Sequence, residues 1–336
     1  MMGGADVKHD DTGKGLLHIL IEEEKIDSIK LLLKNNVDLS IEDDDGWSPL
    51  NAAVYAGNKE IVKLLLEHRA DIDNVDGTKW SPLNIAISEN FSEIALLLIE
   101  QGASINLSDG NGWLPIHFSI LKSTHVVTRC LIQNGAWLNT NDGSGWSPLT
   151  RAVGKVNTYT TTLLIENGAM IDKMDGNAWT PLLMAISKGS IEIVEILIQN
   201  GANLNLGDSF GYLPLQSAIA RHQEYIAKLL IQNGAELNNF DLNGCSPIGY
   251  AAKYGANEIV ALLIENGADI DVQDKIEMNA LHYAVLQNHP KTAITLLSCG
   301  ASLRVKNNQG DVPIEATLKT VDSAAFKSLL NFMHSI

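Results

Sequence analysis

Hydrophobic and polar positions repeat along this chain with a period of 33 residues. A short apolar stretch begins at each proline of one series, and a second, amphipathic stretch such as residues 61–66 (Ile-Val-Lys-Leu-Leu-Leu) follows it. Spacing of this kind is typical of helices with one buried face. The prolines lie at the start of the first stretch, where a missing N–H is tolerated; they are Pro49, Pro82, Pro115, Pro148, Pro181, Pro214, Pro247 and Pro313. Each period therefore predicts two helices.

Polar turn residues recur with the same spacing. An aspartate can open a tight turn by accepting backbone N–H bonds, and it stands at positions 10, 43, 76, 109, 142, 175, 208, 241 and 274, with Asn307 in the tenth place. Glycines that we expect to close this turn with a positive φ follow at 46, 112, 145, 211, 244 and 310. A second glycine series, at 102, 135, 168, 201, 234, 267 and 300, is expected to end the second helix in the left-handed conformation, with Asn36 and Arg69 in that place earlier.

The repeats account for nearly the whole chain. They begin near residues 10, 43, 76, 109, 142, 175, 208, 241, 274 and 307, without an insertion. Self-similarity at a period of 20–50 residues indicates a stack in which each unit packs only on its neighbours. We therefore predict a mainly α-helical solenoid over residues 10–336 as a single domain, built of helix-turn-helix units joined by β-hairpin-like fingers, after a disordered tail of residues 1–9.

The repeat resembles the ankyrin repeat family, over residues 10–336. Residues 43–53 (Asp-Asp-Asp-Gly-Trp-Ser-Pro-Leu-Asn-Ala-Ala) and 267–271 (Gly-Ala-Asp-Ile-Asp) carry the resemblance. It implies a curved stack of helices with projecting fingers, and a protein-binding scaffold whose ligands lie on the concave face of fingers and first helices. The family's box histidine survives only at His18, His117 and His282, so we expect a thinner hydrogen-bond network there.

One repeat departs from the pattern of strong helix formers. Residues 157–162 read Asn-Thr-Tyr-Thr-Thr-Thr, and β-branched threonine lowers helix propensity. We therefore predict a weak second helix in the fifth repeat, and a soft spot in the stack.

The composition of the chain restricts its expected compartment and its class of ligand. The chain has 45% hydrophobic residues and a net charge of −16, which disfavours duplex DNA as a ligand. It has no apolar run of 18 residues, no secretory signal at its start and three widely spaced cysteines, so we expect a reducing compartment and no membrane association. The expected location is the cytoplasm, with the nucleus or delivery into a host cell as alternatives.

Aromatic residues occupy the position after the finger glycine in six successive repeats. We call Trp47, Trp80, Trp113, Trp146, Trp179 and Tyr212 the aromatic column. Tryptophan is strongly enriched where partners bind, so the column is a candidate protein-binding site. The alternative is that the rings pack on one another for stability. Cys245 takes the next place in the series, where we expect a small surface residue.

A second series of residues at this spacing is basic. Lys122, Lys155, Lys188 and Arg221, which we call the basic column, fall at the predicted end of the first helix. They could bind a ligand, or they could only complement the helix dipole. Together the two columns suit an extended or loop segment of another protein with acidic and apolar residues, centred on residues 113–221.

No motif of an enzyme, metal site or cofactor site is complete. The segment around Gly13 lacks the earlier glycine and the serine or threonine of a phosphate-binding loop, and the Asp-Gly fingers lack the spacing of a calcium loop. We therefore expect a non-catalytic scaffold or adaptor without cofactor. A microbial effector or inhibitor acting on a host protein, a single-stranded nucleic-acid binder and an enzyme fragment are the alternatives.

Overall fold

The computed structural model describes residues 15–313. The predicted tail of residues 1–9 and the tenth repeat beyond Pro313 lie outside this range. Within the described residues the chain forms 18 α-helices and no β-strand. Contacts between residues divide the chain after Met170 into two compact units.

The first unit contains the helices of five repeats. They are α1 (Leu16–Glu22), α2 (Ile26–Lys34), α3 (Pro49–Tyr55), α4 (Lys59–Glu67), α5 (Pro82–Ser88), α6 (Ser92–Glu100), α7 (Pro115–Leu121), α8 (His125–Gln133), α9 (Pro148–Gly154) and α10 (Thr158–Glu166). The second unit contains the helices of four further repeats. They are α11 (Pro181–Lys188), α12 (Ile191–Gln199), α13 (Pro214–Ala220), α14 (Glu224–Gln232), α15 (Pro247–Lys253), α16 (Asn257–Glu265), α17 (Ala280–Leu286) and α18 (Pro290–Ser298).

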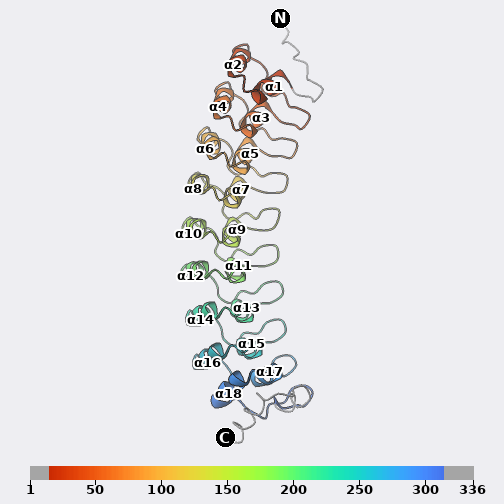
Figure 1. Cartoon of the computed structure of the whole chain (residues 1–336), viewed down its shortest axis with the longest axis vertical. Coiled ribbons are helices and arrows are strands. Elements are labelled where there is room, and N and C mark those ends of the chain that lie inside the picture. The colour runs from red at the N-terminus through yellow and green to blue at the C-terminus, as the bar shows by residue number, and fades with distance from the viewer. Residues whose placement is uncertain (1–14, 314–336) are drawn as a thin grey trace. The chain divides into compact units, whose positions relative to one another are not determined.

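The two helices of each repeat lie in different rows. In each unit the odd-numbered first helices form one row and the even-numbered second helices another, and the fingers project on the side of the first helices (Figure 1). The predicted helix pairs are thus confirmed. The fingers are loops whose backbones are bonded like hairpins: Asp43 N–H donates to Trp47 O at 3.0 Å, and Gly77 N–H donates to Asp45 O of the preceding finger at 3.3 Å.

In α3, α5, α9, α11 and α15 the first helix starts at a proline, and the serine or threonine before that proline caps the helix. Ser48 Oγ accepts the backbone N–H of Asn51 at 3.3 Å, which satisfies a donor that the first turn leaves unpaired. The ends of both helices have left-handed residues, as φ values of +71° at Gly57 and +91° at Gly102 show. The predicted glycine caps of the second helices are therefore confirmed.

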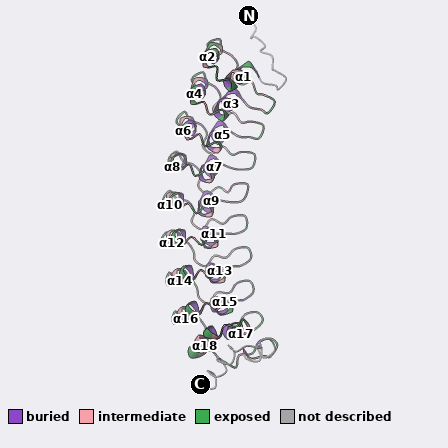
Figure 2. Ribbon diagram, viewed as in Figure 1, coloured by how far each residue is buried: buried purple, intermediate pink, exposed green. Residues whose placement is uncertain are grey.

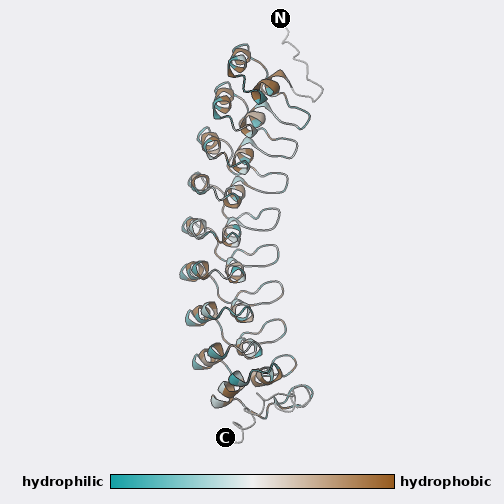
Figure 3. Ribbon diagram, in the orientation of Figure 1, coloured by the Kyte–Doolittle hydropathy of each residue, from teal (hydrophilic) through white to brown (hydrophobic). Residues whose placement is uncertain are grey.

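The core lies between the two rows of helices in each unit. In α5 every residue from Pro82 to Ile87 is buried, whereas α4 buries only one face through Ile61, Val62 and Leu65. Hydrophobic residues accordingly occur on both rows (Figure 3), and most of the exposed helix positions lie on the second helices (Figure 2). Each fully buried leucine or isoleucine stabilises the stack by about 1.5–3 kcal/mol relative to exposure.

Neighbouring repeats are also joined by a recurring side-chain bond. Asn106 Oδ1 accepts the backbone N–H of Trp137, 31 residues later, at 2.9 Å, and Asn139 does the same with Met170 at 2.7 Å. The other acceptors in this register are Asp73 in the first unit and Asp172, Asn205, Asn238 and Asp271 in the second. Each bond satisfies a backbone donor of the next repeat.

The box position keeps more of its hydrogen bonds than expected. His117 Nε2 donates to Thr140 O at 3.1 Å, and Gln216 Nε2 makes the equivalent bond to Asn239 O at 3.1 Å. Leu183 in the same register has no side-chain donor. Asn51 and Asn84 donate in the same way at 3.4 Å, so histidine, asparagine or glutamine makes this bond in some repeats, and it is absent where leucine stands.

The threonine-rich repeat forms a full helix. α10 has nine residues, as many as the other second helices, because the Asn157 side chain caps it by accepting Thr160 N–H at 3.0 Å. The Thr161 hydroxyl is buried without a hydrogen-bond partner among residues 15–313. A helix of reduced length is not observed, and the soft spot stays a prediction.

Candidate functional site

The finger aspartates fix the aromatic column. Asp109 Oδ1 accepts the backbone N–H groups of Asn111 and Trp113, both at 2.8 Å. The same bond to the residue four positions later occurs at Trp47, Trp80, Trp146, Trp179 and Tyr212, at 2.8–3.1 Å. The predicted role of the aspartate as an opener of the turn is therefore confirmed. These bonds hold the backbone of each column residue in the same position relative to the turn of its finger.

Rings of the first unit lie half-buried against the first helices. Trp47 contacts Tyr55 edge to face, with 4.8 Å between ring centroids. Phe118 of α7 lies between two column members, at 5.0 Å from Trp80 and 5.3 Å from Trp113. Aromatic pairs at such distances contribute about 0.5–1.5 kcal/mol beyond the area they bury.

An arginine continues this series of contacts. The Arg151 guanidinium lies over the Trp113 ring at 4.1 Å and over the Trp146 ring at 5.0 Å. Its Nε donates to Asp142 Oδ2 at 2.8 Å, so the cation has a carboxylate partner as well. The contacts thus run from Trp80 through Phe118, Trp113 and Arg151 to Trp146, with a first-helix side chain between successive tryptophans.

The basic column lies where the sequence predicted it. Lys122, Lys155 and Arg221 are the residues that end α7, α9 and α13, and Lys188 is the last residue of α11. All four are exposed. A cation at a helix C-terminus is stabilised by the helix dipole, by about 0.3–1 kcal/mol, and remains available to a ligand.

The two columns meet in a pocket of the second unit. This pocket, of about 430 Å³, is lined by Trp179 and Tyr212 of the aromatic column and by Arg221 of the basic column. Phe210 and Tyr254 contribute further aromatic walls. The Phe210 ring at the finger tip is 67% exposed and Tyr212 is 41% exposed, so both are open to a ligand.

Lys253 adds a second cation to this pocket. Its Nζ lies 6.0 Å from the ring centroid of Tyr250 and 5.9 Å from those of Tyr254 and Tyr283. The hydroxyls beneath are fixed, because Tyr250 donates to Asp241 at 2.7 Å and Tyr283 donates to the Asp274 carboxylate. Burial, and then these carboxylates, raise the pKa of both tyrosines well above the usual value. Both phenols therefore stay neutral donors.

Cys245 is buried, which corrects the expectation of a surface residue. Its exposed fraction is 6%, and its Sγ lies against the first turn of α15 at Gly249. Burial raises the pKa of the Cys245 thiol to about 12, with Asp241 and Asp274 adding to the effect.

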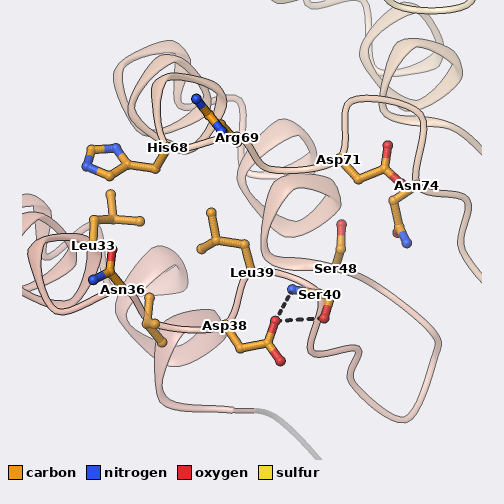
Figure 4. Close-up of a pocket in the computed structure, with 11 residues that line it drawn as sticks. Leu33, Asn36, Asp38, Leu39, Ser40, Ser48, His68, Arg69, Asp71 and Asn74 are labelled. Atoms are coloured by element: carbon orange, nitrogen blue, oxygen red, sulfur yellow. Dashed lines mark hydrogen bonds between the residues drawn. The ribbon is translucent and has the colours of Figure 1, made fainter. Parts of the chain in front are cut away.

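A second pocket lies in the first two repeats of the first unit. It measures about 410 Å³ and includes Asp38, Ser40, Arg69 and Asp71 (Figure 4). Asp38 Oδ1 accepts the Ser40 N–H at 2.9 Å and the Ser40 hydroxyl at 2.6 Å, and these bonds lower the pKa of the Asp38 carboxyl. No member of either column lines this pocket, so it is separate from the candidate site.

Sequence reasoning missed several residues of the site. Phe210 was overlooked because the finger tips of the first unit are small or polar, such as Gly110 and Asn111, and a change at one tip leaves no periodic signal. Arg151 was overlooked because it falls outside both columns. Trp137, the one tryptophan outside the column, is 57% exposed. Comparing the residues at each register position between repeats would have singled out Phe210 and Arg151.

Two other kinds of site are absent from the part of the chain that the structure describes. Residues 15–313 contain no cluster of three His, Cys, Asp or Glu side chains able to hold a metal ion. Their helices have seven to nine residues, whereas a bilayer requires about 20. None of these helices could span a membrane.

Comparisons with known proteins agree with this architecture. The family described as ankyrin repeats (3 copies) matches residues 17–109, 83–175, 155–241 and 237–307. A 55-residue segment is 36% identical to protein phosphatase 1 regulatory subunit 12A of Mus musculus and of Rattus norvegicus, which is 16% of this chain and 5% of those proteins. The chain thus spans about a twentieth of the length of these curated relatives.

A solved structure shows the same fold. The ankyrin repeat domain of Bcl-3, a member of the IkappaB protein family, superimposes with a TM-score of 0.59 at 23% sequence identity. The similarity covers 66% of this chain and 99% of that domain. Since the family match reaches from residue 17 to residue 307, the chain belongs to the ankyrin repeat family.

Proposed function

We propose that this chain is a non-catalytic scaffold that binds another protein along the surface of its fingers and first helices. Ankyrin repeats are protein–protein interaction modules. The observation that carries the proposal is the pocket of the second unit, in which Trp179 and Tyr212 of the aromatic column meet Arg221 of the basic column. Tryptophan, tyrosine and arginine are the residue types that contribute most to binding energy at interfaces.

The site is also preorganised for binding. Asp208 Oδ1 holds the finger by accepting the N–H groups of Phe210 and Tyr212, both at 2.9 Å. Side chains on a fixed backbone lose less conformational entropy when a partner arrives, which leaves more of the contact energy as affinity. A modest interface, of about 800 Å² on each partner, is then sufficient.

Charge and chemistry favour a protein segment with acidic and apolar residues. Arg221 and Lys253 provide positive charge beside aromatic walls, and opposite charges attract an acidic partner. The net charge of −16 repels nucleic acid, whose binding depends on phosphate neutralisation. Cys130, Cys245 and Cys299 are all free thiols, in agreement with the reducing compartment that we propose.

Affinity capture followed by mass spectrometry tests the function. The full chain would be compared with the double variant Tyr212→Ala/Arg221→Gln, which changes exposed residues of the pocket. The matched control is Tyr225→Ala/Lys228→Gln, which makes the same kinds of change on α14, where these residues pair with Glu195 and Glu258. Trp146, although a member of the aromatic column, is not substituted, because its ring contacts the buried Arg151 and its loss would also change stability.

We expect a protein that the wild type and the control retain and that the double variant loses. With the purified partner, calorimetry should show affinity about 30-fold weaker for the double variant, since a hot spot contributes about 2 kcal/mol or more. Equal losses in both variants would contradict the assigned surface. A fluorescent single-stranded oligonucleotide that binds more tightly than any protein, with a steep salt dependence, would instead favour nucleic acid.

A further inference from the structure

The pocket of the second unit has a composition that restricts its ligand. Its aromatic walls come from separate repeats: Trp179 and Tyr212 from two fingers, and Tyr254 from the end of α15. Pockets of about 300–1,000 Å³ hold compact ligands, so 430 Å³ suits a single large side chain rather than a folded domain. Flat aromatic groups find edge-to-face and stacked contacts between such walls.

Two basic side chains line the same pocket. Arg221 follows α13 and Lys253 ends α15, so the cations come from two successive repeats. Neither forms an ion pair with any of residues 15–313. Asp208 is the one carboxylate on the pocket wall, and its Oδ1 already accepts two backbone N–H groups. The pocket wall therefore carries two cations and one carboxylate, and that carboxylate is already bonded to the finger backbone.

Three tyrosine rings lie near the ammonium group of Lys253. The ring centroids lie 5.9–6.0 Å from its Nζ, a distance at which a ring face attracts a cation. Lys253 is nevertheless exposed, so its ammonium group can reach a carboxylate of a bound segment.

We propose that this pocket binds a segment of the partner in which an aromatic residue lies between two acidic residues. The aromatic side chain enters between Trp179, Phe210 and Tyr212, and the flanking carboxylates pair with Arg221 and Lys253. Two cations on separate repeats call for two carboxylates, which an internal acid–aromatic–acid sequence supplies. The inference rests on the proposed function and specifies the ligand of the same site.

Short peptides test the ligand chemistry without the natural partner. The probe is the acetylated and amidated pentapeptide Gly-Glu-Phe-Glu-Gly, and its controls replace both glutamates by glutamine or the phenylalanine by alanine. The full chain is labelled at the indole nitrogens, and titrations are followed by proton–nitrogen NMR. The signal of Trp179 is assigned with the variant Trp179→Phe.

We expect the acidic aromatic peptide to shift the Trp179 signal while leaving those of Trp47 and Trp80 unchanged. Each control peptide should bind at least fivefold more weakly. Arg221→Gln and Lys253→Gln should each weaken the probe about threefold to fivefold, as exposed ion pairs do. Lys122→Gln, in the same register of the first unit, should have no effect. Circular dichroism checks that these surface variants keep their helices.

Three results would overturn the inference. They are equal binding of the glutamine peptide, equal binding of the alanine peptide, and shifts of the Trp47 signal as large as those of Trp179. Failure of this test is distinct from failure of the proposed function. A captured protein that depends on Tyr212 and Arg221, together with no peptide selectivity, would preserve the scaffold function and reject the acid–aromatic–acid ligand.

Discussion

Arg151 and Asp142 form a buried ion pair within one repeat of the first unit. The Nε–Oδ2 distance is 2.8 Å, and the side chains are 11% and 0% exposed. The guanidinium also fills the space between the Trp113 and Trp146 rings. This pair therefore links the finger, the first helix and two members of the aromatic column.

Removing the cation should destabilise the first unit strongly. Arg151→Met leaves the Asp142 carboxylate buried without its cation, and we expect the free energy of unfolding to fall by about 3 kcal/mol. Urea denaturation followed by circular dichroism measures the change. Arg129→Met is the control, since Arg129 is exposed on α8 and bonds to Tyr159. Equal effects of the two substitutions would contradict the role of the buried pair.

Val156 should be replaceable with a gain in stability. Its φ of +55° is strained for a β-branched residue, and its side chain is 48% exposed, so little packing would be lost. We expect Val156→Gly to raise the free energy of unfolding by about 1 kcal/mol, because relief of strain exceeds the added entropy of the unfolded chain. Val156→Ala, which keeps Cβ, should gain less. A loss of stability on Val156→Gly in the same urea assay would show that the residue is not strained.

His117 should make the first unit sensitive to acid. Nδ1 accepts the Leu114 N–H at 3.1 Å and Nε2 donates to Thr140 O, so only the neutral ring satisfies both bonds. Burial, the largest cause, lowers the pKa of His117 from 6.5 to about 4. Between these values the unfolded chain binds more protons than the folded one, and stability falls as the pH falls.

The pH dependence can be isolated with one substitution. Glutamine makes the equivalent bond at position 216, so His117→Gln is a non-titrating match. Between pH 7 and pH 4 the wild type should lose about 3 kcal/mol more than this variant, as the pKa difference requires. Parallel urea midpoints for the two proteins across this range would refute the assignment.

The three cysteines should differ in reactivity. The thiolate is the nucleophile, and burial raises the pKa of both Cys245 and Cys130, whereas Cys299 is exposed at the end of α18. We expect alkylation at pH 7.5 to modify Cys299 first, then Cys130, and Cys245 last. Peptide mass spectrometry over a time course measures the order, and urea should remove the differences. Early modification of Cys245 in the folded protein would contradict its burial.

Features determined inside one repeat were predictable from the sequence. The turn at Asp109, the positive φ of Gly112 and the left-handed end at Gly135 depend only on local backbone chemistry. The same residue types recur every 33 residues, so each of these predictions was supported by several repeats. The positive φ of Lys79, by contrast, was not predicted, because that residue has no intrinsic preference for it and the finger around it imposes the conformation.

Features that depend on the neighbouring repeat were not predictable in this way. Phe118 and Arg151 lie between tryptophans only because the first helix of one repeat faces the finger of the preceding one. The positions of both columns were predicted, but the pocket that joins them in the second unit was not, since one of its walls is the Phe210 ring at a finger tip. Contacts of this kind are determined by how neighbouring repeats pack, which the pattern within one repeat does not specify.

The bond from Asn106 to the Trp137 amide has a consequence for how such a chain can change in length. Its donor is a main-chain group that any residue except proline offers, and its acceptor is supplied by asparagine or aspartate alike. The joint between repeats is therefore interchangeable. Removing or duplicating one whole 33-residue repeat within a unit should therefore re-form the same bond between the repeats that become neighbours. Gene segments of that length can then be lost or gained without further substitutions at the contact between repeats.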